Sequence, residues 1–138
     1  MVYVKNKVKR VFEVCLVFFY RLIGMKVAGT AKISLKSQLD TTHPRGVFIG
    51  EFTMITAGVL ILSHDFVNQR KLKTKIGRNC FIGAKSVILP GVTVGDNCVI
   101  AAGSIVTSDL LPNGLYGGNP AKFIKEITVG EYGKKIDS

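Results

Sequence analysis

The chain contains two histidines, His43 and His64, and a histidine is the side chain best suited to proton transfer near neutral pH. His64 stands between Ser63 and Asp65. A neutral imidazole can act as a general base, because it removes the proton of a hydroxyl while the hydroxyl oxygen attacks a carbonyl carbon. The other interpretation of each histidine is an exposed loop residue without a chemical role. The elements around them decide between the two.

Aliphatic residues recur at every sixth position through the second half of the chain. They are Ile76, Ile82, Ile88, Val94, Ile100 and Val106. A period of six fits neither the 3.6 residues of a helical turn nor the strand spacing of a sandwich. It is typical of a hexapeptide β-helix, in which short strands stack coil upon coil. We expect Ile76 to stack on Val94, Ile82 on Ile100 and Ile88 on Val106, with Phe81 pointing outward.

The register begins at Val27 and is interrupted twice, near 40–48 and at 63–75. Insertions in such a stack go to its corners and commonly form its functional face. Each interruption contains one histidine. His64 follows the inward Ile61 by three residues, so it should leave the core at a corner, which favours catalysis over an inert loop position. We interpret His43 as a loop residue lining an acceptor pocket, and Asp40 or Ser37 as a residue that orients His64.

Composition restricts the partners. The formal net charge of +10 calls for an anionic partner, and nucleic acid ranks last because no zinc-finger spacing or aromatic RNA-binding motif occurs. Three cysteines form no CxxC pair and no metal-ligand spacing, so no metal is expected. No cleavable secretory signal is evident, and we expect buried, reduced thiols in a cytoplasmic protein.

The whole chain, 1–138, is expected to be one domain with three parts. Residues 1–25 should form an amphipathic helix, 26–111 the β-helix, and 112–138 a C-terminal cap and tail. Within the last part, residues 120–127 read as a short helix or a final strand. The fold class is therefore all-β, a parallel β-helix with an N-terminal helix.

The N-terminal helix has an apolar face by helical phasing. Its residues are Val8, Val11, Phe12, Cys15, Leu16, Phe19 and Ile23. One interpretation, which we favour, packs this face against the prism or a neighbouring subunit. The other is peripheral contact of residues 2–25 with the inner membrane surface, since basic residues accompany the apolar ones. The apolar run is too short to span a bilayer.

Four segments together resemble the hexapeptide-repeat acyltransferases of the galactoside, maltose and nodulation-factor acetyltransferase type, and their relatives in polysaccharide biosynthesis. The segments are 76–84 (IGRNCFIGA), 88–97 (ILPGVTVGDN), 101–107 (AAGSIVT) and 117–122 (GGNPAK). The resemblance implies a left-handed parallel β-helix, a homotrimer with active sites between subunits, and acetyl-CoA as donor. It also implies a catalytic histidine just before a protruding loop, which matches His64.

The resemblance further implies contacts for the donor and the acceptor. Donor candidates are Gly83, Ala84, Ala102, Thr107, Lys122 and Lys125. The Ala84 N–H is the candidate oxyanion donor. The family's usual basic residue after the position of Thr107 is Ser108 here, which weakens phosphate binding at that point. Acceptor candidates are Asp40, His43, Asp65 and Arg70.

The function expected is transfer of an acetyl group from acetyl-CoA to a sugar hydroxyl, in surface polysaccharide or glycolipid biosynthesis. Two alternatives stay open: acetylation of an amino sugar, and a non-catalytic trimeric scaffold. A zinc carbonic anhydrase on the same fold needs about three histidine ligands, and this chain has two histidines.

Overall fold

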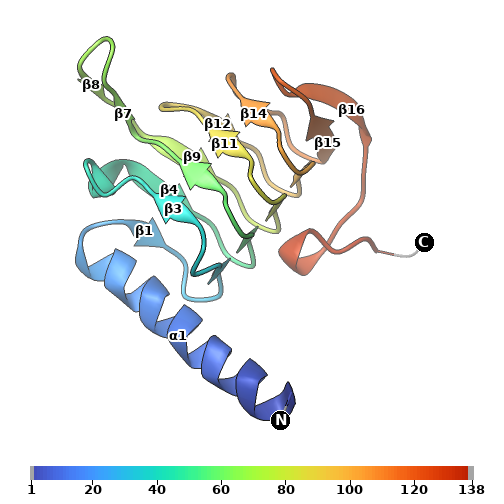
Figure 1. Ribbon diagram of the computed structural model, residues 1–138. Coiled ribbons are helices and arrows are strands. Elements are labelled where there is room, and N and C mark those ends of the chain that lie inside the picture. The colour runs from blue at the N-terminus through green and yellow to red at the C-terminus, as the bar shows by residue number, and fades with distance from the viewer. Residues whose placement is uncertain (1, 137–138) are drawn as a thin grey trace.

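The computed structural model describes residues 2–136, and most of them form a prism of short parallel strands (Figure 1). Residue 1 and residues 137–138 lie outside the described residues. They belong to the predicted segments 1–25 and 112–138. Each coil contributes one strand to each of three sheets, so strands of successive coils pair in parallel.

The three sheets form the three sides of the prism. The first sheet consists of β1 (Lys26–Val27), β4 (Val47–Ile49), β9 (Thr74–Ile76) and β12 (Thr93–Val94). The second consists of β2 (Lys32–Ile33), β5 (Met54–Ile55), β10 (Phe81–Ile82), β13 (Val99–Ile100), β15 (Gly114–Gly117) and β16 (Lys122–Glu126). The third consists of β3 (Gln38–Leu39), β6 (Leu60–Ile61), β11 (Val87–Ile88) and β14 (Ile105–Val106).

Three shorter features lie at the corners and in the tail. β7 (His64–Asp65) and β8 (Arg70–Lys71) form an antiparallel hairpin that projects from the prism. One 3₁₀ helix, η1, spans Pro44–Gly46, and a second, η2, spans Glu131–Gly133.

The predicted ladders are confirmed. Ile76 pairs with Val94, Ile82 with Ile100 and Ile88 with Val106, and these side chains fill the inside of the prism. Phe81 points outward as expected and is half-buried. Aliphatic side chains fill these inward positions because every coil closes over the one below it.

Cys80 and Cys98 also occupy inward positions of successive coils, and both are free, buried thiols. Burial raises the pKa of Cys80 to about 12, so this thiol stays protonated at neutral pH. The two cysteines therefore serve as small core residues.

Helix α1 (Val2–Leu22) crosses the N-terminal end of the prism and extends beyond it (Figure 1). Val17 and Tyr20 are buried against the first coil, and Leu16 and Ile23 pack beside them. Of the predicted apolar face only Leu16 and Ile23 pack on the prism, so the prediction of packing on the prism is wrong for most of that face, whereas packing on a neighbouring subunit stays a prediction. The other residues of the face, Val8, Val11, Phe12, Cys15 and Phe19, are exposed. Within residues 2–136 no helix combines the length and apolar character needed to cross a bilayer.

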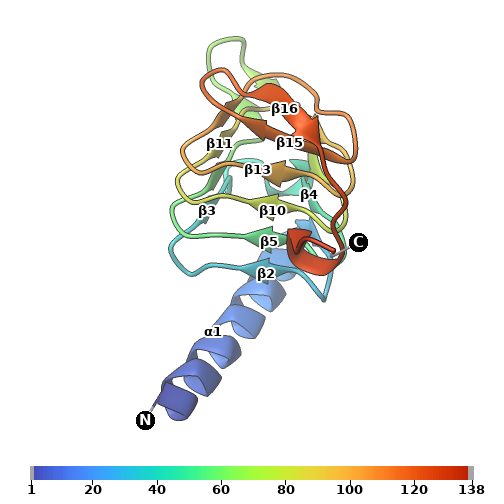
Figure 2. The same ribbon diagram turned by 90° about the vertical axis from the view of Figure 1, so that its right-hand side faces the viewer.

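The chain after the last coil closes the other end of the prism. β16 pairs antiparallel with β15, so the strand interpretation of residues 120–127 is the correct one. Residues 127–136 then return along the second sheet to the first coils (Figure 2). There the Tyr132 hydroxyl donates to the Thr30 carbonyl at 2.7 Å, and the Tyr132 N–H donates to the Phe52 carbonyl at 2.7 Å.

Candidate functional site

His64 begins the projecting hairpin. It follows the buried β6 by three residues and pairs with Lys71 across β7 and β8. The Leu72 N–H donates to the Ser63 carbonyl at 2.9 Å and continues the pairing toward the prism. The long interruption of the hexad register is thus an ordered hairpin, and His64 is half-buried at its root.

Asp40 holds the backbone at this root. One carboxylate oxygen accepts the N–H groups of Ser63 at 3.0 Å and His64 at 3.1 Å, and the other accepts the Thr42 N–H at 2.9 Å. Although burial by itself raises the pKa of Asp40, the hydrogen bonds from Ser63, Thr42 and His64 hold it below its ordinary value. Both oxygens are engaged with the backbone and the residue is 8% exposed, which favours a positioning role over contact with an acceptor.

His43 lies beside the same root. Its carbonyl accepts a hydrogen bond from the Ser63 hydroxyl at 2.6 Å. A Cβ added at Gly46 would lie 2.5 Å from the His43 ring and 2.3 Å from the Leu72 carbonyl oxygen, so only glycine allows the two loops to approach this closely. The structure therefore brings the two interruptions of the repeat together. Ser37, the second predicted orienting residue, donates its hydroxyl to the Ser34 carbonyl at 2.6 Å within its own turn.

The His64 imidazole packs edge-on against Phe66, with ring centroids 4.1 Å apart. Its Nδ1 is buried and has no hydrogen-bond partner among residues 2–136. Sequence reasoning did not single out Phe66. The alternation of a strand was the available signal, because residues two apart lie on one face.

Asp65 and Arg70 shape the hairpin turn. The Asp65 carboxylate accepts the N–H groups of Val67 at 3.0 Å and Asn68 at 3.1 Å, the Asn68 amide at 2.7 Å, and Arg70 Nη2 at 3.4 Å. Hydrogen bonds from the side chain and backbone of Asn68 are the main cause that lowers the pKa of Asp65 to about 2. These two acceptor candidates are thus paired with each other in the exposed turn.

The predicted donor contacts lie on a different edge of the prism. Ala84 and Ala102 are exposed at the corner between the second and third sheets, and the Ala84 carbonyl accepts the Gly103 N–H at 2.8 Å. The Ala84 N–H has no partner within residues 2–136, which leaves it available as a donor. Gly83 is buried, and a Cβ there would lie 2.5 Å from the Ala102 nitrogen. Its lack of a side chain therefore serves coil stacking.

The remaining donor candidates are exposed. Thr107 follows β14 at the corner between the third and first sheets, and Lys122 and Lys125 lie on β16 at the C-terminal end of the prism. His64 leaves the prism at the same kind of corner as Thr107, whereas Ala84 and Ala102 lie across the third sheet. A single chain therefore does not bring His64 together with the predicted oxyanion donor.

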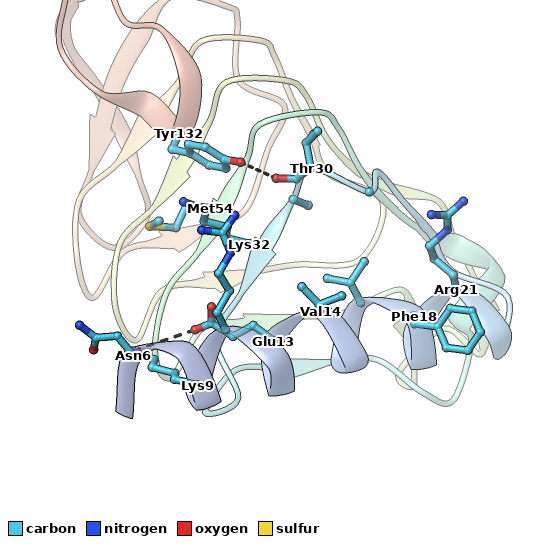
Figure 3. A pocket seen from close by; sticks show the side chains of 14 residues that line it. Asn6, Lys9, Glu13, Val14, Phe18, Arg21, Thr30, Lys32, Met54 and Tyr132 are labelled. Atoms are coloured by element: carbon cyan, nitrogen blue, oxygen red, sulfur yellow. Dashed lines mark hydrogen bonds and ion pairs between the residues drawn. The ribbon is translucent and has the colours of Figure 1, made fainter. Parts of the chain in front are cut away.

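A groove of about 680 Å³ lies between α1, the first coil and the returning tail (Figure 3), and His64 is not among the residues that line it. Within residues 2–136, no group of three or more His, Cys, Asp or Glu residues could hold a metal ion.

Comparison with known proteins adds to this geometry. The family described as hexapeptide repeat of succinyl-transferase matches residues 73–108. The putative acetyltransferase YvoF of Bacillus subtilis (strain 168) is 34% identical over 110 residues, which are 78% of this chain and 64% of YvoF. Protein CapG of Staphylococcus aureus is 38% identical over 122 residues, which cover 80% of this chain and 71% of CapG.

A solved structure is also similar. A galactoside acetyltransferase in complex with coenzyme A matches with a TM-score of 0.54 and 32% identity, over 78% of this chain and 57% of that chain. The chain thus spans less than two thirds of the length of this protein, and the same holds for YvoF.

Proposed function

The chain belongs to the hexapeptide-repeat acyltransferase family, and from this membership we propose that it transfers an acetyl group from acetyl-CoA to a sugar hydroxyl. The observation that carries the proposal is His64 at the root of the hairpin, with its backbone held by Asp40. An imidazole fixed at the edge of a rigid prism suits general-base catalysis, because the base must lie within hydrogen-bond reach of the proton that it removes.

His64 acts as the general base in this proposal. Its Nε2 accepts the proton of the acceptor hydroxyl while the hydroxyl oxygen attacks the thioester carbonyl carbon. The Ala84 N–H donates to the oxyanion of the tetrahedral intermediate. The carbon–oxygen ester bond forms and the carbon–sulfur bond breaks, and the imidazolium returns the proton to the departing thiolate.

The tautomer of His64 follows from this role. Nε2 can accept a proton only if Nδ1 carries the hydrogen of the neutral ring.

The active site is proposed to lie between copies of a homotrimer of left-handed β-helices. His64 and Ala84 occupy edges of the prism on opposite sides of the third sheet. A second copy packed beside the first would bring its own Ala84 edge next to the His64 edge of the first copy. The separation of His64 from Ala84 within one chain supports a site completed by assembly.

Donor binding is proposed to use the exposed corner of Ala84 and Ala102 for the pantetheine arm, since small side chains allow a ligand to approach the main chain. Gly83 allows the coils that carry Ala84 and Ala102 to stack closely at this corner. Thr107, Lys122 and Lys125 lie toward the nucleotide phosphates, where the two ammonium groups offset the loss caused by Ser108. The galactoside acetyltransferase complex, which contains coenzyme A, supports a donor of this class.

The acceptor is proposed to be a sugar of a surface polysaccharide or glycolipid precursor, at the inner face of the membrane in the cytoplasm. The hairpin beside His64 carries Arg70, Lys71 and Lys73, all exposed, and their charge attracts an anionic or phosphate-linked sugar. His43 lies next to the same root and lines the acceptor side. The free thiols of the core fit a reducing compartment.

Two measurements test the function. Titration of the full chain with acetyl-CoA by calorimetry should give a binding heat, and a non-catalytic scaffold should give none. Incubation with acetyl-CoA and a panel of sugars, glycolipids, nucleotide sugars and amino sugars should then add the mass of one acetyl group to a hydroxyl acceptor. Loss of that group on mild alkaline treatment indicates an ester, whereas a stable amide would overturn O-acetylation in favour of N-acetylation.

A further inference from the structure

The outward face of α1 is apolar, and nothing in residues 2–136 covers it. The helix contacts the first coil through Leu16, Val17 and Tyr20. The residues of the outward face are between 49% and 69% exposed; they are Val4, Val8, Val11, Phe12, Val14, Phe18, Phe19 and Leu22. Residues three and four apart lie on one side of a helix, so these side chains form a continuous surface.

The charges of α1 are nearly all of one sign. Its basic residues are Lys5, Lys7, Lys9, Arg10 and Arg21. Its only acidic residue is Glu13, which is half-buried on the side of the first coil and lies 4.0 Å from the Lys9 ammonium. The exposed apolar face is therefore flanked by five basic residues of the helix, and one carboxylate compensates only Lys9.

This charge decides between the candidate occupants. A second copy packed face to face on this helix would bring the same cationic flanks, so like charges would meet around the apolar contact. An anionic bilayer offers lipid phosphates to the cations and an apolar boundary to the phenylalanines. The surface is complementary to the bilayer and not to itself.

We propose that α1 docks the protein on an anionic lipid membrane, with the helix lying in the plane of the interface. The face that contains Phe12, Phe18 and Phe19 enters the boundary between headgroups and acyl chains, while the basic side chains reach back to the phosphates. Because α1 lies at the N-terminal end of the prism (Figure 1), the first coil faces the membrane. This inference does not depend on the transfer reaction.

The groove beside α1 belongs to the same surface. It has a volume of about 680 Å³, and its charged lining consists of Lys9, Arg10, Arg21, Lys32 and one carboxylate, that of Glu13 (Figure 3). The Lys32 ammonium lies 4.2 Å from the centroid of the Tyr132 ring, which holds it at the wall of the groove. Three cations of the helix and Lys32 of β2, against one carboxylate, extend the positive surface toward the prism, where lipid phosphates would lie.

Flotation of the full chain with lipid vesicles tests this proposal. Vesicles of phosphatidylcholine and phosphatidylglycerol in equal parts should bind the protein at least about tenfold more tightly than vesicles of phosphatidylcholine alone. Added sodium chloride should weaken the binding, because the flanking charges are exposed. Absence of binding to the anionic vesicles would overturn the proposal.

Matched variants locate the contact. Phe12→Ser with Phe19→Ser should reduce vesicle binding at least about tenfold by removing buried apolar area, whereas Leu111→Ser with Ile136→Ser, exposed apolar residues on other elements, should leave it unchanged. The helix variant should keep its circular dichroism, its mass by sedimentation and its heat of acetyl-CoA binding, which separates this proposal from the transfer reaction. Undiminished vesicle binding, or a lower oligomeric mass, would instead contradict docking of this face on lipid.

Discussion

The carboxylate of Asp40 accepts a hydrogen bond from the backbone N–H of His64 at 3.1 Å, although 24 positions separate the two residues. The same oxygen accepts the N–H of Ser63, whose hydroxyl donates to the His43 carbonyl. One buried carboxylate thereby joins the two insertions of the repeat. The position of the proposed base is set by the loop of the preceding coil as much as by its own hairpin.

Substitution of Asp40 should affect catalysis through the position of His64. In Asp40→Asn an amide NH₂ replaces one acceptor oxygen and faces a backbone N–H group, which should cost about 1–3 kcal/mol of unfolding free energy. We expect kcat to fall more than KM rises. The measurements are urea unfolding and steady-state kinetics.

Asp109 provides the matched control. It is exposed, and its carboxylate accepts a single backbone N–H, from Thr93 at 2.8 Å, on a different part of the prism. Asp109→Asn should cost less unfolding free energy and leave kcat unchanged. Equal losses of kcat in the two variants would show that Asp40 has no special relation to His64.

The stabilisation by Asp40 should also depend on pH. Its pKa is lower in the folded chain than its ordinary value of 3.8, so the folded state binds the proton less readily than the unfolded state. The stabilisation by ionised Asp40 is therefore complete at pH values above the ordinary pKa. It is lost as the pH falls through the lowered pKa of the folded chain. The difference in unfolding free energy between the wild type and Asp40→Asn should shrink on acidification, and a constant difference would contradict this origin. Asp65 also has a lowered pKa, but it is present in both proteins, so its effect cancels when the two unfolding free energies are subtracted.

Replacement of His64 should remove catalysis and leave the scaffold intact. His64→Ala should lower kcat by about 10²–10⁴-fold, the usual contribution of a positioned general base. Its mass in solution and its heat of acetyl-CoA binding should match the wild type. His43→Ala is the comparison, because His43 lies beside the same root, and it should raise KM with a smaller effect on kcat. Full turnover by His64→Ala would exclude the assigned base.

The repeat could be predicted from the sequence, whereas the site could be predicted only in part. Ile82 and Ile100 are identifiable as stacked residues because every coil imposes the same inward position on the chain. Asp40 and Ser37 are both candidates to orient His64, but the sequence cannot choose between them, because the contact of Asp40 with the His64 backbone joins two insertions that have no period. The side of α1 that packs on the prism could not be predicted either. Periodicity identifies an apolar face but does not say that Tyr20, outside that face, meets the prism.

Gly83 is required for close stacking of two coils. A Cβ at this position would lie 2.5 Å from both the Ala102 nitrogen and the Ile100 carbonyl oxygen, so two coils would have to part. Gly83→Ala should therefore cost about 3 kcal/mol of unfolding free energy. Gly103→Ala is the control, because its Cβ would meet no atom within 4 Å and only its φ of 73° opposes a side chain; it should cost about 1 kcal/mol. Chemical denaturation compares the two, and equal losses would show that close coil stacking does not explain the glycine.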